Sequence, residues 1–276
     1  MKSMIKGKMK EKHSNNLLVE GVTFDAENNS FTFDFEHDSR HDLVKLVADG
    51  PYMLEDYDPC IYYGYVFEDG IDSRLKKQFI DLIKYPSQQI QESDLNRFIV
   101  RSVANLDKKI SLPKYDVIVH PQSSSDLNAK IIREIYNRSL SDKVLEIELI
   151  KDLPSKMEFN YDLYVDSLKH KTGINQKNID NSVLAIKRMM DDIRKLDYVK
   201  LGTYVKAKYR PYIKNFFYFK DEDSKKAYES LQGKNVLIVD DVSTTRATLQ
   251  YVLNAIRLVN DSCSIAMFCL LGNRTK

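Results

Sequence analysis

Between residues 115 and 271, short apolar runs of strand length alternate with segments whose apolar residues recur at helical spacing. The strand-like runs cover residues 116–120, 144–150, 216–219, 236–239 and 265–271. The helical segments carry their apolar faces at 127–135, 179–193 and 249–256. This alternation is typical of chains in which helices connect parallel strands and cover both faces of the sheet. The sequence therefore predicts an α/β fold with a mostly parallel sheet flanked by helices.

The first 110 residues show a less regular pattern. Two short apolar runs, Leu17–Val22 and Phe31–Phe35, flank the turn-rich stretch Asp25–Ser30 and predict a β-hairpin. A strand is expected over Ile61–Phe67, followed by two helices near 72–85 and 93–106. We therefore expect residues 1–110 to form a smaller α+β unit. Residues 111–276 would form the core, with a helical insertion at about 151–214.

Composition narrows the class of protein. The 276 residues include 42 Lys and Arg against 40 Asp and Glu, a net charge of +2, which excludes binding nucleic acid through overall charge alone. Three cysteines exclude a disulfide scaffold. The sequence contains no apolar run of about 18 residues that would predict a membrane helix. Residues 1–12 are rich in lysine but lack the apolar stretch of a secretory signal, so we expect a solvated terminus and a cytoplasmic protein.

One segment combines a buried strand, two acids and a polar turn before a helix. The strand 236–239 is followed by Asp240 and Asp241, then by Ser243, Thr244, Thr245, Arg246, Ala247 and Thr248. In a parallel sheet, ligands bind beyond the carboxyl ends of the strands. A loop that leads into a helix offers free N–H groups and a favourable dipole to a phosphate. The paired carboxylates could accept hydrogen bonds from sugar hydroxyls or hold the water shell of Mg²⁺.

Two other interpretations of this segment fail on chain length and on a missing partner motif. The acidic pocket of a response-regulator receiver lies on the first strand and needs about 100 further residues, but 276 − 241 leaves 35. A Walker B strand needs a G-x-x-x-x-G-K-[ST] loop, which the sequence lacks. An ordinary buried strand that ends in Asp before a Thr-capped helix remains the structural alternative.

The segment 236–249 resembles the phosphoribosyl-pyrophosphate (PRPP) loop of type I phosphoribosyltransferases. The resemblance implies that Asp240 and Asp241 hold the ribose hydroxyls. It also implies a 5′-phosphate site formed by Ser243, Thr244, Thr245, Arg246, Ala247 and Thr248. Arg246 stands where the family usually has Gly, and it could add a contact to phosphate or block the pocket. Thr244 replaces the Asp that handles a proton in the 6-oxopurine enzymes, which disfavours hypoxanthine or guanine salvage.

A second polar loop lies where this family has its pyrophosphate loop. Gln122, Ser123, Ser124 and Ser125 follow the strand 116–120 and precede a helix, so they could cap that helix or bind pyrophosphate. Fainter similarities, in residues 62–65 and the helix that ends at 83–85, and in residues 127–129 and 210–216, point to the ComF branch of the family. That branch's zinc ribbon is absent, because the three cysteines form no C-x-x-C pair.

The resemblance implies the type I phosphoribosyltransferase fold, with residues 1–110 as a hood over the site. It implies an enzyme of the pentosyltransferase class that binds PRPP with Mg²⁺ as its cofactor, without a protein-only metal site. The phosphoribosyl group would pass to a nucleobase or related amine, and a homodimer is compatible with this interpretation. The alternative is a non-catalytic module that binds PRPP or a nucleotide, or handles DNA as ComF does.

Two further features have ordinary structural explanations beside functional ones. His37 and His41 have a spacing that could bind metal on a helix, but no third ligand is evident and the residues between them are polar. The stretch 198–220 interleaves Lys and Arg with aromatic residues, so it could stack a base, contact single-stranded nucleic acid, or pack against the sheet.

Overall fold

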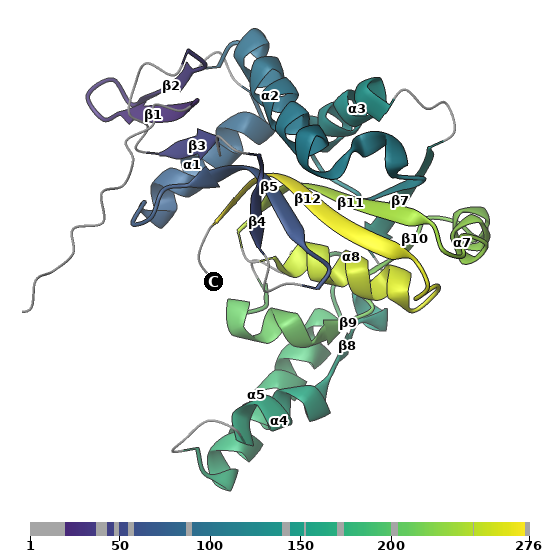
Figure 1. The fold of residues 1–276 in the computed structure, drawn as a ribbon. Helices are drawn as coiled ribbons and strands as arrows, with labels where there is room; N and C mark the ends of the chain where they lie inside the picture. Colours follow the sequence, from purple (N-terminus) through teal and green to yellow (C-terminus); the bar gives the residue numbers. More distant parts are fainter. Residues whose placement is uncertain are drawn as a thin grey trace, which may run out of the picture.

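The computed structural model describes ten segments of the chain (Figure 1), which are residues 20–36, 43–46, 50–54, 58–86, 90–139, 144–151, 153–169, 174–199, 204–244 and 246–273. The predictions made for residues 1–12, for His37 and His41, and for Thr245 lie outside these residues. None of the described helices has the length and apolar character needed to cross a membrane.

A ten-stranded mixed sheet forms the centre of the molecule, in the order β10-β7-β6-β11-β12-β5-β3-β1-β2, with β4 paired to β5. Its parallel centre consists of β7 (Leu145–Lys151), β6 (Val117–Pro121), β11 (Asn235–Ser243), β12 (Ser264–Asn273) and β5 (Ile61–Phe67). The antiparallel strands are β10 (Phe217–Phe219), β3 (Val44–Leu46), β1 (Gly21–Asp25), β2 (Ser30–Asp34) and β4 (Tyr52–Leu54). The predicted α/β class is therefore confirmed, and the sheet is parallel in its centre and antiparallel toward its margins.

Helices cover both faces of this sheet (Figure 1). On one face lie α1 (Ser73–Lys84), α2 (Glu92–Ile110) and α3 (Leu127–Ser139), whose apolar residues share a core with the N-terminal strands. On the other face lie α7 (Glu222–Glu229) and α8 (Ala247–Arg257). Asp72 caps α1 by accepting the N–H groups of Arg74 and Leu75, and Phe79 anchors the helix by full burial. Burying such a side chain stabilises the fold by about 1.5–3 kcal/mol.

The N-terminal strands belong to the same sheet as the rest of the chain. Strand β5 pairs in parallel with β12, and the predicted hairpin is confirmed as β1 and β2, which pair from Gly21 with Asp34 to Asp25 with Ser30. Helix α2 lies so close to β5 at Gly64 that a Cβ there would stand 1.5 Å from the Ser102 hydroxyl oxygen. The division of the chain near residue 110 stays a prediction.

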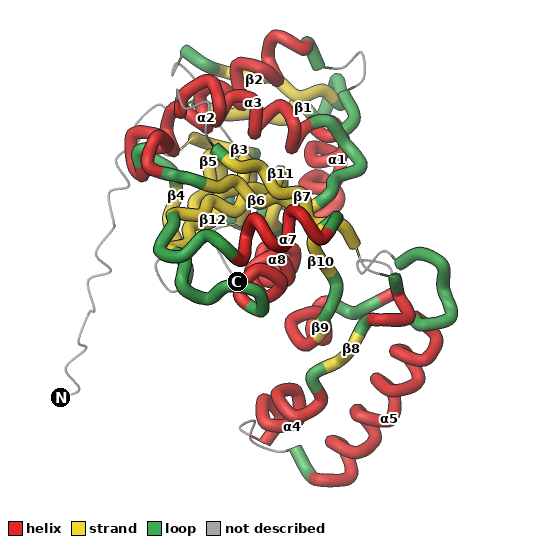
Figure 2. The backbone as a smooth tube through the Cα atoms, turned by 90° about the vertical axis from the view of Figure 1, so that its right-hand side faces the viewer, coloured by secondary structure: helices red, strands yellow, loops and turns green. Residues whose placement is uncertain are grey.

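Residues 153–214 form a helical hairpin with a small two-stranded sheet, and Figure 2 shows the hairpin projecting from the body of the molecule. Its elements are η2 (Pro154–Lys156), β8 (Glu158–Phe159), α4 (Tyr161–Lys169), α5 (Gln176–Ile193), η3 (Ala207–Tyr212) and β9 (Ile213–Lys214). Tyr164 packs its ring against those of Tyr209 and Tyr212, and its hydroxyl lies 2.5 Å from Ser182. Aromatic packing therefore joins α4 to η3, the hydroxyl contact joins α4 to α5, and η3 contacts α8.

Candidate functional site

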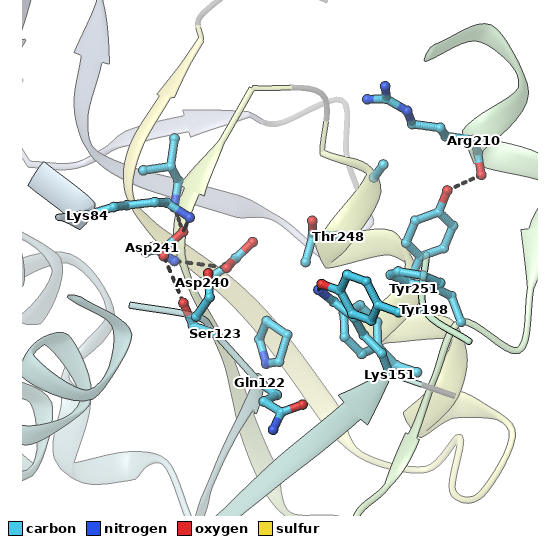
Figure 3. Close-up of a pocket in the computed structure, with 16 residues that line it drawn as sticks. Lys84, Gln122, Ser123, Lys151, Tyr198, Arg210, Asp240, Asp241, Thr248 and Tyr251 are labelled. Carbon is cyan, nitrogen blue, oxygen red and sulfur yellow. Dashed lines mark hydrogen bonds and ion pairs between the residues drawn. The ribbon is translucent and has the colours of Figure 1, made fainter. Parts of the chain in front are cut away.

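The order in which the chain adds strands to the sheet reverses between β6 and β11. From β6 the chain enters α3 on one face and returns to β7, whereas from β11 it enters α8 on the opposite face and returns to β12. The carboxyl ends of β6 and β11, which are neighbours, therefore open onto a crevice. A cavity of about 300 Å³ lies there, lined by residues from both loops, from α1, and from the chain after β7 (Figure 3).

The two acids of β11 lie at one wall of this cavity, and both are buried. Asp241 is 2% exposed, and its Oδ1 accepts the N–H of Val242 at 2.6 Å, while its own N–H donates to Asp240 Oδ1 at 3.0 Å. Burial, reinforced by the neighbouring Asp241 charge, raises the pKa of Asp240 to about 8, against the opposing effect of Lys84. Burial and the neighbouring acid therefore favour the protonated form of Asp240.

Lys84, the last residue of α1, supplies the opposite charge. Its Nζ lies 2.7 Å from Asp241 Oδ1, and its side chain is 25% exposed, on the wall of the cavity. Burial acts to lower the pKa of Lys84, but the carboxylates of Asp241 and Asp240 outweigh it and raise that pKa. Lys84 belongs to a stretch with a faint family resemblance, but its contact with Asp241 was not predicted, because that contact joins segments far apart in the chain.

The serine loop after β6 meets the acids across the crevice. Ser123 Oγ donates to Asp241 Oδ2 at 3.4 Å and accepts the N–H of Ser125 at 3.2 Å. Ser124 Oγ lies 2.7 Å from the hydroxyl of Tyr85, the residue after α1. Asn128, in the first turn of α3, donates to the carbonyl of Pro121 at 3.3 Å. This loop is thus held beside both β11 and the end of α1.

The loop after β11 delivers α8 to the same cavity. Ala247 and Thr248, in the first turn of α8, line it, so the amino end of this helix faces the crevice. Ser243 is buried at the end of β11. Thr244 is exposed, and its carbonyl accepts a hydrogen bond from Asn273 Nδ2 at 3.1 Å.

Arg246 occupies a left-handed backbone position, with φ of 62° and ψ of 0°. Glycine adopts this conformation without steric cost, whereas a side chain with a Cβ is strained in it. The guanidinium is buried: Nε donates to Tyr63 Oη at 3.3 Å and Nη2 to the Asn273 carbonyl at 3.4 Å. Arg246 does not belong to the lining of the cavity.

The wall opposite the acids includes Tyr198 and Arg210 from the stretch that could stack a base, together with Lys151 and Tyr251, which were not predicted as site residues. Figure 3 shows Lys151, Tyr198 and Tyr251 there, facing Asp240 and Asp241 across the cavity. Lys151 ends β7, and its Nζ lies 3.3 Å from Tyr198 Oη and 5.4 Å from the centre of that ring. The Tyr251 hydroxyl donates to the carbonyl of Arg210, which itself lines the cavity.

The structure thus brings together seven of the residues predicted from sequence, namely Gln122, Ser123, Ser124, Asp240, Asp241, Ala247 and Thr248. Four others lie beside the cavity without lining it, namely Ser125, Ser243, Thr244 and Arg246. Among the described residues, no group of three or more His, Cys, Asp or Glu side chains is arranged to hold a metal. Searches for a matching family model and for a matching curated protein sequence found none.

Proposed function

We propose that this cavity binds PRPP together with Mg²⁺, and that the protein transfers the phosphoribosyl group to a nucleobase or related amine. The observation that carries the proposal is the placement of three features around one cavity of about 300 Å³. They are the paired acids of β11, the amino end of α8 and the serine loop after β6.

Each feature matches one part of the ligand. The first turn of α8, with Ala247 and Thr248, offers N–H groups and a hydroxyl to the 5′-phosphate. The acids accept hydrogen bonds from the ribose hydroxyls, which suits Asp241 in its charged form. Ser123 and Ser124 donate to the pyrophosphate across the crevice.

Mg²⁺ fits this donor set when the ligand completes its shell. Two adjacent carboxylates supply hard oxygen atoms, and Mg²⁺ commonly combines one or two carboxylates with phosphate oxygens and water. When bound, the ion would neutralise charge on the pyrophosphate. Asp240 and Asp241 are the residues placed to reach its water shell.

In the proposed reaction, the lone pair of an acceptor nitrogen forms the bond to C1 of the ribose. The C1–O bond breaks and its electron pair leaves with the pyrophosphate, while a hydrogen on the acceptor nitrogen passes to water as a proton. The protein's contribution is to hold the two partners in line and to stabilise the charge that builds on the leaving group through Ser123, Ser124 and the loop N–H groups.

The test is release of pyrophosphate from PRPP and Mg²⁺ in the presence of a panel of nucleobases and aromatic amines. Base-dependent release by the wild-type protein, lost in Asp241→Asn, is the expected result. If the protein binds PRPP but releases no pyrophosphate with any acceptor, the result would instead support the non-catalytic alternative. The Lys84–Asp241 ion pair favours that alternative, because it already neutralises one of the acids.

A further inference from the structure

One of the two carboxylate oxygens of Asp241 is fully occupied in this structure. Oδ1 accepts the Val242 N–H at 2.6 Å and lies 2.7 Å from Lys84 Nζ, while Oδ2 accepts the Ser123 hydroxyl at 3.4 Å. The Val242 N–H is fixed by the strand. A ribose hydroxyl or a water of Mg²⁺ can therefore take Oδ1 of Asp241 only when Lys84 moves, whereas Oδ2 has one acceptor site left beside its long hydrogen bond from Ser123.

Lys84 is the partner best able to move. It ends α1, so its long side chain extends from a helix terminus, and a quarter of that side chain is exposed to the cavity. It also lines a second cavity of about 400 Å³, together with Tyr85, Ser124 and Lys130. Figure 3 shows Asp241 between Lys84 and Ser123, and Lys84 and Ser124 line both cavities.

An ammonium that leaves a buried carboxylate needs another anion, because an uncompensated buried charge is strongly destabilising. A pyrophosphate group on the serine loop would provide one, since Ser123 and Ser124 line the same cavity as Lys84. The Asp241 carboxylate would then be released for the sugar and the metal.

We propose that Lys84 is a tethered cation that neutralises Asp241 in the ligand-free protein and transfers to the pyrophosphate when PRPP binds. This inference rests on the proposed function and deepens it, because it makes binding of the polyanion a condition for binding of the metal. Lys84 is thereby both a ligand of the pyrophosphate and a competitor of Mg²⁺ for the acids.

The test compares Lys84→Met with Lys77→Met, a matched control on the exposed side of the same helix, where Lys77 pairs with Asp81. Two affinities are measured by calorimetry: that for Mn²⁺ without phosphate, and that for inorganic pyrophosphate in EDTA. We expect Lys84→Met to bind Mn²⁺ more tightly and to bind pyrophosphate about tenfold more weakly, the loss of one charged hydrogen bond. Lys77→Met should match the wild type in both.

Asp241→Asn removes the same ion pair from the other side and keeps the inference testable if Lys84→Met does not fold. It frees Lys84, so pyrophosphate affinity in EDTA should rise while Mn²⁺ affinity falls. General damage to the site would instead weaken the binding of both Mn²⁺ and pyrophosphate in Lys84→Met and in Asp241→Asn. That outcome would overturn the inference.

The two proposals fail in different ways. A wild-type protein that binds neither PRPP nor ribose 5-phosphate would refute the proposed function. A wild-type protein that binds both, with Mn²⁺ and pyrophosphate affinities unchanged by Lys84→Met, would refute the role of Lys84 alone.

Discussion

Arg246 offers a prediction in which backbone and side chain can be separated. Its φ of 62° is costly for any residue with a Cβ, and its guanidinium donates to Tyr63 and to the Asn273 carbonyl. Arg246→Ala and Arg246→Gly both remove these hydrogen bonds and leave the buried Tyr63 hydroxyl without its Arg246 donor. This lowers the free energy of unfolding of each variant by about 1–3 kcal/mol. Only Gly removes the steric strain of the left-handed backbone. After subtraction of its greater conformational entropy in the unfolded chain, this gain is about 1 kcal/mol.

We therefore expect Arg246→Gly to be more stable than Arg246→Ala by about 1 kcal/mol, with both less stable than the wild type. Urea unfolding followed by far-UV circular dichroism measures the free energy of unfolding of each variant. The chain has no Trp, so the fluorescence of its 17 Tyr is the second probe. Equal stability of the two variants, or a more stable Ala variant, would refute the left-handed conformation of this residue.

The same pair of variants tests the direction of the Arg246 side chain. Because the guanidinium binds Tyr63 and Arg246 does not line the cavity, Arg246→Gly should keep its affinity for ribose 5-phosphate within about threefold of the wild type. A loss of about tenfold or more would mean that the guanidinium contacts the phosphate directly.

Two further predictions concern the buried acid and the close packing at β5. Burial raises the pKa of Asp240 from an ordinary 3.8 to about 8, so between these pH values the folded state keeps a proton that the unfolded state releases. The stability that this proton contributes is therefore lost as the pH rises from about 4 to 8. Asp240→Asn should therefore flatten the decline of unfolding free energy between pH 5 and 8, about the range that the raised pKa spans, whereas parallel curves for variant and wild type would contradict the assignment. Gly64→Ala should destabilise the protein by about 1–3 kcal/mol, because the added Cβ meets Ser102. Adding Ser102→Gly should restore most of that loss, and a double variant as unstable as Gly64→Ala would show that the clash lies elsewhere.

Local patterns predicted the parts of the fold whose cause is local. The alternation of apolar runs located β6, β7, β11 and β12, and the acids that follow an apolar run fell at the carboxyl end of β11. The hairpin of β1 and β2 was also predicted, but its turn is shorter than expected. The turn is short because the Asp25 carboxylate accepts the N–H groups of Glu27 and Asn28, so strand pairing extends to Asp25 and Ser30.

Features that depend on long-range pairing were not predicted. The place of Lys84 in the site was not predicted, because nothing near α1 indicates that the end of this helix meets β11. The pairing of β5 with β12 was missed for the same reason, since the partner of a strand is not encoded in its own alternation. Both explanations considered for Arg246 placed its side chain at the phosphate, whereas the left-handed backbone directs it to Tyr63 and β12.

The central claim is that the crevice between β6 and β11 is a PRPP site. Isothermal titration of the wild-type protein with PRPP in the presence of Mg²⁺, repeated with Asp241→Asn, tests it most directly. We expect saturable binding by the wild type and an affinity about tenfold lower in the variant, since one charged hydrogen bond to the ribose is lost. No heat of binding at millimolar PRPP, or equal affinity of the two proteins, would contradict it.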